Sequence, residues 1–331
     1  MEAVLEPRTA SRIEVFHRSL FAMNTRFSMV LAGVDRDRAE ALAAAAEREL
    51  RTQEHTMSRF DAAGPLAGLN RRAADQAVAP PAELWEILLL CRDHWRRTSG
   101  AFDITLWPLS RLWREHLERG EEPSQEAIAQ ARGQTGMDRL HFDTEACTVR
   151  FETPGMSLDL GGFGKGYALD RVAGSLRAQG VEQAFLSFGE SSITVLGAHP
   201  HGPDWPVGIA DIFEPARAVH TFHLKDASLS SSGTAPFNCM TGLKSLGQTA
   251  SPIVGQIINP CNGRPIEGFR TMSVASPTAT EAEVLSTALL VTPERDRAAL
   301  LSGFSAISAV EIAYHPGERD FGARIQWQYG L

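Results

Sequence analysis

The residues with the clearest chemical potential lie in a glycine-rich stretch near the middle of the chain. From Asp159 to Asp170 the sequence reads DLGGFGKGYALD, with four glycines and one lysine, Lys165. Glycine lets the backbone approach a ligand closely, and a helix that starts here would present unpaired N–H groups to an anion. Lys165 adds a positive charge at the same place. The stretch is typical of a phosphate-binding turn, and equally of a tight strand-to-helix turn that binds nothing.

Several familiar site types do not fit this chain. The GxxxxGK[ST] spacing of a Walker loop is absent, and Lys165 occupies part of the register of a G-x-G-x-x-G dinucleotide fingerprint. The cysteines are too dispersed to form a CxxC pair, which argues against a zinc ribbon or a thioredoxin-type site.

The composition also excludes classes of partner. The formal net charge is −8 and no long run of Lys or Arg occurs, so we expect neither nucleic acid nor an anionic membrane as the main partner. No stretch reaches the roughly 18 apolar residues that a membrane span needs. The N-terminal residues carry charges without an apolar core, unlike a signal peptide or lipoprotein leader, so the sequence predicts a cytoplasmic protein.

The elements that must position the glycine-rich stretch alternate irregularly along the chain. We expect a flexible lead-in over residues 1–12, a hairpin over 14–31 and a loop-rich segment over 233–268. Helices are predicted over 35–57, 81–98, 125–133, 167–179 and 280–290, the fourth ending at Gly180. Strands are predicted over 148–151, 157–160, 184–188, 192–196, 218–224 and 271–275.

Strands and helices interleave without a repeat or an evident linker. The sequence therefore predicts a single α+β domain over residues 13–331, built on mixed sheets with packed helices.

The glycine-rich stretch resembles the central motif D-L-G-G-I-A-K-G-Y-A-V-D of the ApbE family of FAD:protein FMN transferases. Five further stretches appear in that family's order, and the six together cover residues 20–310. The five are Met23-Asn24-Thr25, Met57-Ser58-Arg59-Phe60-Asp61 with Leu69-Asn70, Gly100-Ala101-Phe102-Asp103, Gln256-Ile257-Ile258-Asn259-Pro260 with Gly263, and Ala282-Glu283-Val284-Leu285-Ser286-Thr287-Ala288. The resemblance implies the ApbE-like fold, which is related to the T-fold.

The resemblance also implies an FAD site and a magnesium site. Cofactor-binding roles carry over to Met23, Phe60, Ala101, Phe102, Asp103, Asp159, Lys165 and Ile257. The implied Mg²⁺ ligands are oxygen atoms of Gly162, Glu283, Ser286 and Thr287, and the last three would share one face of a helical turn. By residue type alone, Phe60 and Phe102 are also typical of core packing, and Glu283 of a solvated helix face.

The implied reaction is phosphoryl transfer: FMN moves from FAD to a Ser or Thr hydroxyl of an acceptor protein, and AMP is released. The resemblance assigns catalytic roles to Gln256, Lys165 and Glu283. Gln256 stands where the family has histidine, and a glutamine cannot act as a titrating base near neutral pH. The other departures from the motif are Asn24 for glycine, Asn259 and Glu283 for aspartate, and Gly189-Glu190-Ser191 for G-G-D.

Three functions are compatible with this sequence. The first is the flavin transferase itself. The second is a non-catalytic FAD-binding protein, such as a flavin chaperone or sensor, for which Gln256 is the best support. The third is magnesium-dependent hydrolysis of FAD to FMN and AMP, with water in place of the acceptor hydroxyl.

Overall fold

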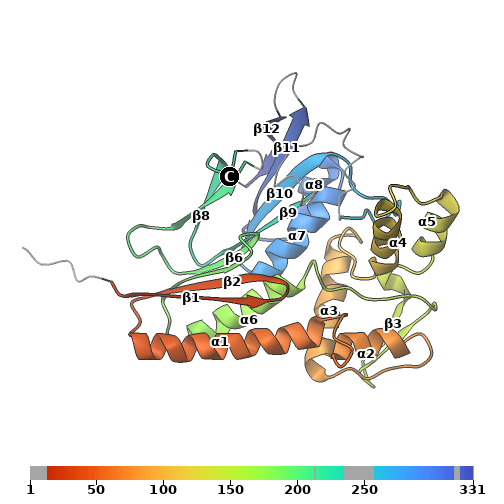
Figure 1. The fold of residues 1–331 in the computed structure, drawn as a ribbon, viewed down its shortest axis with the longest axis horizontal. Coiled ribbons are helices and arrows are strands. Elements are labelled where there is room, and N and C mark those ends of the chain that lie inside the picture. Colours follow the sequence, from red (N-terminus) through yellow and green to blue (C-terminus); the bar gives the residue numbers. More distant parts are fainter. Residues whose placement is uncertain (1–12, 212–213, 235–256, 317–320, 331) are drawn as a thin grey trace, which may run out of the picture.

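The computed structural model describes residues 13–211, 214–234, 257–316 and 321–330, so the predicted lead-in over 1–12 lies outside the described residues. An eight-stranded sheet forms the centre of the molecule (Figure 1), and every pairing between its neighbouring strands is antiparallel. In spatial order its strands are β1 (Val15–Ala22), β2 (Thr25–Ala32), β5 (Gln183–Phe188), β6 (Ser192–Leu196), β9 (Ser228–Gly233), β10 (Phe269–Ser276), β11 (Ser308–Pro316) and β12 (Phe321–Tyr329).

Helices cover one face of this sheet. Helix α6 (Gly164–Ala178) packs on β5 and β6, and α7 (Ala279–Val291) packs on β9, β10 and α6. The long helix α1 (Arg36–Met57) lies over α6 and β1 (Figure 1). Their apolar stripes meet the sheet in a core that includes Phe27, Leu42, Leu169 and Leu186. Because α6 and α7 touch, residues far apart in the sequence meet between them.

The opposite face carries a separate hairpin. Strand β7 (Trp205–Ala210) alternates buried and exposed residues throughout, and its partner β8 (Ala218–Leu224) does so over its last four residues, as expected for a strand pair with one face on a core. Val207 and Phe222 pack in one cluster with Val195 and Ile312 of the large sheet.

A helical part is inserted between β2 and β5 and lies beside the sheet (Figure 1). It comprises α2 (Pro65–Arg72), α3 (Ala82–Arg97), α4 (Trp107–Leu117), α5 (Gln125–Arg132) and the hairpin of β3 (Leu140–Asp143) and β4 (Thr148–Phe151). Its core includes Leu88 and Phe151, and it continues into Phe163 at the start of α6. A last helix, α8 (Glu294–Leu301), follows α7.

The α+β prediction is confirmed, as are the predicted first hairpin and helices α1, α3, α5 and α7. Asp35 caps α1 through its side chain, and Gly180 follows α6 with a φ of 74°, the left-handed conformation expected after a helix. That residues 13–331 form one domain stays a prediction.

One predicted boundary and one predicted strand were wrong. Helix α6 begins at Gly164, three residues before the predicted start, and its first turn includes Gly166, where an added Cβ would overlap the carbonyl oxygen of Ala279 on α7. Residues 157–160 form no strand. Instead, the side chain of Asn70 bonds to both the N–H and the carbonyl of Leu158, and the N–H of Asp159 bonds to Ile104. These contacts replace a strand ladder.

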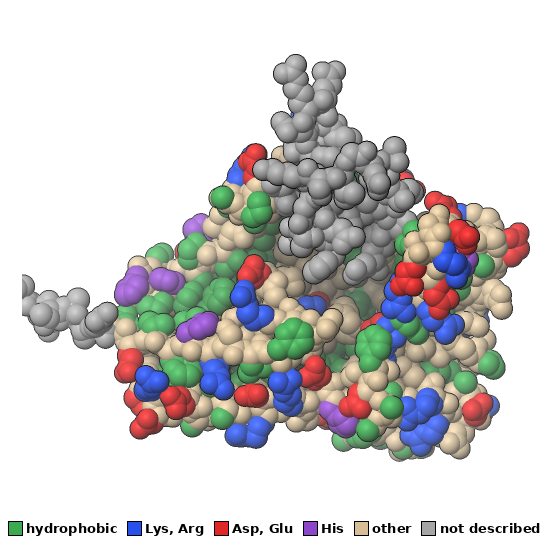
Figure 2. Space-filling model, in the orientation of Figure 1, with side chains coloured by type: hydrophobic (Ala, Val, Ile, Leu, Met, Phe, Trp, Pro, Cys, Tyr) green, Lys and Arg blue, Asp and Glu red, His purple; other side chains and the backbone are tan. Residues whose placement is uncertain are grey.

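No helix among the described residues combines the length and the hydropathy needed to cross a bilayer. On the face drawn in Figure 2, Lys and Arg side chains are interspersed with Asp and Glu, so no broad basic patch forms there among the described residues.

Candidate functional site

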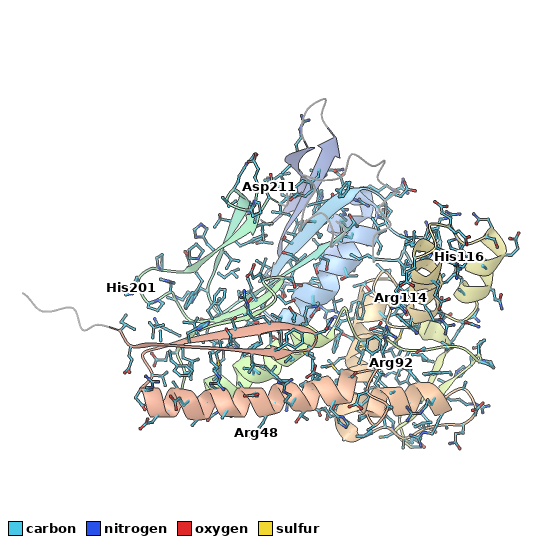
Figure 3. All side chains as sticks on the ribbon, in the orientation of Figure 1. Arg48, Arg92, Arg114, His116, His201 and Asp211 are labelled. Atoms are coloured by element: carbon cyan, nitrogen blue, oxygen red, sulfur yellow. The ribbon has the colours of Figure 1, made fainter. Side chains whose placement is uncertain are left out.

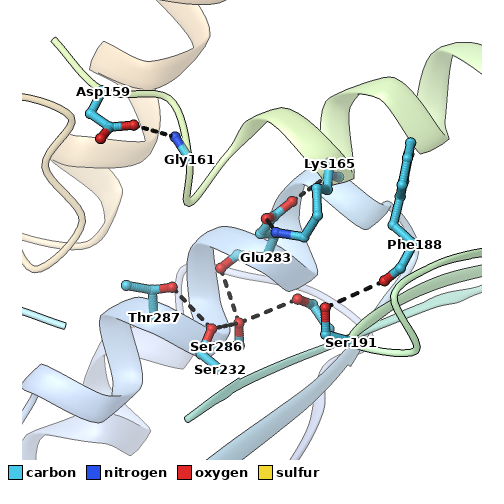
Figure 4. A network of polar contacts seen from close by, with 11 residues as sticks. Asp159, Gly161, Lys165, Phe188, Ser191, Ser232, Glu283, Ser286 and Thr287 are labelled. Carbon is cyan, nitrogen blue, oxygen red and sulfur yellow. Dashed lines mark hydrogen bonds and ion pairs between the residues drawn. The ribbon is translucent and has the colours of Figure 1, made fainter. Parts of the chain in front are cut away.

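The glycine-rich turn lies directly in front of α6 and opposite α7. Asp159 accepts a hydrogen bond of 2.8 Å from the N–H of Gly161 through Oδ1 (Figure 4). Gly161 and Gly162 are exposed, and a Cβ added at Gly162 would lie 3.9 Å from the Thr287 hydroxyl. The turn therefore leaves open backbone facing the side chains of α7, as a close-approaching ligand requires.

Glu283 of α7 is the buried centre of this region. The residue is 2% exposed, and its Oε1 lies 2.5 Å from Nζ of Lys165. Its Oε2 accepts a hydrogen bond from the N–H of Gly166 in the first turn of α6. The carboxylate thus occupies the positive end of the α6 dipole. The solvated helix face that Glu283 suggests by residue type alone is excluded.

Hydroxyl groups extend these contacts along α7, and we call Lys165, Glu283, Ser286, Thr287 and Ser232 together the polar network. Ser286 donates to the carbonyl of Glu283 at 3.0 Å, and its Oγ lies 2.7 Å from that of Ser232. Ser232, on β9, also lies 3.1 Å from the Thr287 hydroxyl (Figure 4). Four predicted residues, Gly162, Glu283, Ser286 and Thr287, therefore meet in one place, the last three on one face of α7 as their spacing indicated and Gly162 as the resemblance implied. All offer oxygen atoms, which hard divalent cations prefer.

Asp170 locks α6 to the start of α7. Its two oxygens accept hydrogen bonds of 2.8 Å from the N–H groups of Ala279 and Thr280, and a third bond, from the Thr280 hydroxyl, is 2.6 Å long. Burial raises the pKa of Asp170, an effect that these hydrogen bonds and the charge of Arg177 oppose. The contact fixes the register in which Glu283 meets Lys165.

Met23 lies at the tip of the β1–β2 hairpin and borders the same turn. Met23 and Asn24 have φ values of 50° and 61°, which suits a two-residue hairpin turn. Asn tolerates this conformation better than most residues, so Asn24 fits the turn although it is not glycine. The N–H of Met23 bonds to Glu54, and the Met23 side chain packs near Gly164.

The neighbouring turn contains the motif departure at 189–191. Gly189 and Glu190 also have positive φ values, and the exposed Glu190 carboxylate lies 2.7 Å from Arg26. Ser191 donates a hydrogen bond to the carbonyl of Phe188 at 3.4 Å, on the side of the polar network (Figure 4). The Glu190 carboxylate therefore forms a surface ion pair with Arg26 and does not join the contacts around Glu283.

The two predicted aromatic contacts differ. Phe60 is 76% exposed, so its ring is available to a ligand, whereas Phe102 is 4% exposed and packs in the core near Phe163. Core packing therefore accounts for the Phe102 side chain and not for Phe60.

Asp103 is engaged with its own chain. Its Oδ1 accepts bonds from the N–H and hydroxyl of Thr105, and Oδ2 accepts one from Met137. Burial raises the pKa of Asp103, and these hydrogen bonds oppose the rise.

Ala101 lines a cavity of ≈ 510 Å³ beyond the C-terminal end of α7. Asn259 lines the same cavity, and its side chain accepts a hydrogen bond from the N–H of Cys261. An aspartate would make this bond equally well, so the change to Asn259 preserves the turn. Ile257 is half-buried and packs against the core cluster of Leu285, Leu289 and Leu301 on α7 and α8. Gln256 lies outside the described residues, so its predicted role is not tested.

Sequence reasoning missed three residues of this region: Arg59, Trp107 and Ser232. Arg59 bonds to Asp159 and contacts the rings of Phe60 and Trp107. It occupies the variable position of its motif, so no sequence signal singled it out. Ser232 lies on β9, which adjoins the segment predicted to be loop-rich.

The chain matches the model of the ApbE family over residues 23–310. It is 27% identical over 276 residues to an FAD:protein FMN transferase of Klebsiella pneumoniae strain 342, covering 81% of this chain and 76% of the relative. It is 25% identical over 275 residues to that of Escherichia coli strain K12, with the same coverage. The flavin transferase ApbE from Vibrio cholerae has the same fold, with a TM-score of 0.75 at 22% identity over 95% of this chain and 97% of the other. The ApbE protein from Thermotoga maritima has a TM-score of 0.78 at 22% identity, over 91% and 94%.

Proposed function

Because this chain belongs to the ApbE family, we propose that it transfers FMN from FAD to a Ser or Thr hydroxyl of an acceptor protein and releases AMP. Its homology to FAD:protein FMN transferases supports this reaction. The observation that carries the proposal is the contact between Lys165 and Glu283 beside the open backbone of the glycine turn. A cation, a carboxylate and hydroxyl groups meet there around a space that glycine keeps free.

The side-chain and backbone oxygen atoms at this contact fit a magnesium ion. The ligands would be Glu283, the Thr287 hydroxyl and the carbonyls of Gly162 and Ser286, which are all hard oxygen donors. Among the residues with a described structure, no group of three or more His, Cys, Asp or Glu side chains is placed to hold a metal. A zinc or copper site is therefore a poorer fit than a site with one carboxylate. When bound, Mg²⁺ would neutralise charge on the diphosphate.

The protein's own residues would bind and orient the substrate. The exposed glycines let the diphosphate approach the backbone, and Lys165 holds the negative charge that develops on the departing AMP. Phe60 and Met23 offer apolar surface to flat rings. The oxygen of the acceptor hydroxyl bonds to the FMN phosphorus. The P–O bond of the anhydride breaks, and AMP leaves with that electron pair and takes up the hydroxyl proton. Positioning and charge stabilisation account for such a reaction without a titrating base at position 256.

The test is an AMP-release assay on the full chain with FAD and Mg²⁺, with and without a Thr-containing acceptor domain. Flavin fluorescence of the acceptor after denaturing electrophoresis reports the covalent product. A relative of known activity, run on the same acceptor, is the positive control. We expect AMP only when acceptor is present, in equal amount to the flavin that the acceptor gains.

Two other results would replace this function. Tight FAD binding without AMP, while the control modifies the acceptor, would indicate the non-catalytic binding protein. AMP formed equally without acceptor would indicate hydrolysis of FAD.

A further inference from the structure

An alternating series of cations and aromatic rings ends at Phe60. The guanidinium carbon of Arg59 lies 3.9 Å from the centre of the Phe60 ring and 3.0 Å from that of Trp107. On α4, Arg114 (Figure 3) follows with its guanidinium carbon 4.9 Å from the Trp107 ring centre. We call Phe60, Arg59, Trp107 and Arg114 the aromatic stack. Each neighbouring pair is within the range of an attractive cation–π contact.

The stack is tied to the glycine turn. Arg59 Nε lies 2.9 Å from Oδ2 of Asp159, and the other oxygen of that carboxylate accepts the N–H of Gly161. The Arg59 side chain is only 12% exposed. Burial lowers the pKa of Arg59, which the nearby Asp159 carboxylate opposes by favouring the charged form. One planar group therefore contacts two rings and the carboxylate next to the glycines.

Phe60 is the exposed ring of the stack: 76% of it is exposed, whereas Trp107 is half-buried and the Arg59 side chain between the two rings is 12% exposed. A phenylalanine ring with this much open surface has little packing of its own to fix its orientation. Its loop is instead held by Arg59 beneath the ring and by a hydrogen bond from the Phe60 N–H to Ser58. The open ring surface thus stays in one place while remaining accessible.

We propose that Arg59 is a positioning residue that holds the Phe60 ring ready to stack on a flat heterocycle of FAD. This inference rests on the proposed function, because it takes FAD as the ligand. Arg59 acts through Phe60 and Asp159: it sets the distance between the open ring and the glycine turn, so that one ligand can span both. Lysine would preserve the charge beside Asp159 but lacks the planar group that contacts both rings.

The experiment compares Arg59→Lys with Arg92→Lys by FAD titration, monitored through flavin fluorescence, without acceptor. Arg92 is a matched control because it also lies over a ring, that of Phe142 at 4.7 Å, outside the candidate site (Figure 3). We expect Arg59→Lys to raise the Kd for FAD about tenfold, while Arg92→Lys leaves it unchanged. We also expect Phe60→Leu to abolish any further effect of Arg59→Lys in the double variant. Trp107→Leu, which removes the ring beneath Arg59, should raise the Kd as well.

The ring that stacks on Phe60 is identified by measuring the Kd of the same variants for FMN through flavin fluorescence and for AMP, which has no flavin, through calorimetry. If Arg59→Lys weakens the binding of FMN, the isoalloxazine ring stacks on Phe60; if it weakens the binding of AMP, the adenine ring does. An unchanged Kd in both Arg59→Lys and Trp107→Leu, or additive effects of Arg59→Lys and Phe60→Leu, would overturn the inference. Wild-type protein that binds no FAD at all would instead overturn the proposed function.

Discussion

The polar network and the aromatic stack lie on either side of the glycine turn and differ in how complete they are. In the polar network, each oxygen of Glu283 already accepts a hydrogen bond, one from Lys165 and one from Gly166. In the aromatic stack, the last ring is open on a surface that nothing in the described chain covers. A ligand adds a layer to the stack but must displace a partner in the network. A cation that binds Glu283 must therefore replace a hydrogen bond that the carboxylate already accepts, whereas a ring that stacks on Phe60 replaces no protein contact.

The strongest test of this comparison is Glu283→Gln. Loss of the carboxylate leaves Lys165 without its partner and removes the only acidic group predicted to bind the metal. We expect AMP release with acceptor to fall about 100-fold, since it depends on this charge arrangement. The control is Glu294→Gln, an exposed carboxylate at the start of α8. An AMP-release rate in Glu283→Gln equal to that of the wild type would show that the reaction does not depend on the Glu283 carboxylate of α7.

The tightness of the network can be tested by adding one methyl group. A Cβ at Gly166 would overlap the carbonyl oxygen of Ala279 and lie 2.9 Å from Oε2 of Glu283. We expect Gly166→Ala to lower the free energy of unfolding by about 1–3 kcal/mol, measured by denaturant titration.

Gly174→Ala is the matched control for this change. Gly174 lies on the same helix and has nothing within 4 Å of its added Cβ. Alanine should therefore stabilise the protein there by about 0.5–1 kcal/mol. Equal effects at the two positions would show that α6 and α7 are not closely packed.

If a metal ion must displace Lys165 from Glu283, the variant Lys165→Met should bind Mg²⁺ more tightly than the wild type. The Lys165 ammonium occupies Oε1 of Glu283 at 2.5 Å, so it competes with any cation for that oxygen. We expect Lys165→Met to bind Mg²⁺ about tenfold more tightly without FAD, as measured by calorimetry, although AMP release falls. Arg171→Met, which removes another ion pair of α6, is the control. Weaker Mg²⁺ binding in Lys165→Met would contradict the competition.

The smallest expected effect concerns Asp170 and pH. Burial raises its pKa above the ordinary 3.8, so the folded protein holds this proton more tightly than the unfolded chain. Its contribution to stability is therefore greatest in acid and is lost as the pH rises through the folded pKa. The stability difference between wild type and Asp170→Asn should shift in favour of Asp170→Asn as the pH increases above 3.8. A shift in the opposite sense would mean that the hydrogen bonds outweigh burial.

Much of the polar network could be predicted from the sequence because its members lie in motifs that resemble those of the ApbE family. Ser286 and Thr287 follow Glu283 by three and four residues, which places all three on one face of a helical turn, and Lys165 lies between two glycines of the central motif. The aromatic stack could not be predicted. Arg59 and Trp107 are 48 positions apart, and only the packing of α4 beside the loop after α1 brings them together.

The early start of α6 shows a second limit. Glycine has a low helix propensity, which favoured a start at Tyr167. In the structure Gly166 lies in the first turn of α6 and is packed so closely on α7 that an added Cβ would overlap Ala279, and such a tertiary contact leaves no local mark in the sequence. Likewise, Ser157 to Leu160 has the composition of a strand, but Asn70 takes up the hydrogen bonds that a ladder would need.

The order of strands in the large sheet has a consequence for how the protein reaches its folded state. Phe27 of β2 pairs with Phe188 of β5, and the whole helical part is made between them. Contacts between residues so distant in sequence slow folding. Until β5 has been synthesised, the hydrogen-bonding edge of β2 stays open, and open edges promote aggregation. Met23, Lys165 and Glu283 come together only late in that process, so a chain truncated before α7 would lack the site even if its helical part had formed.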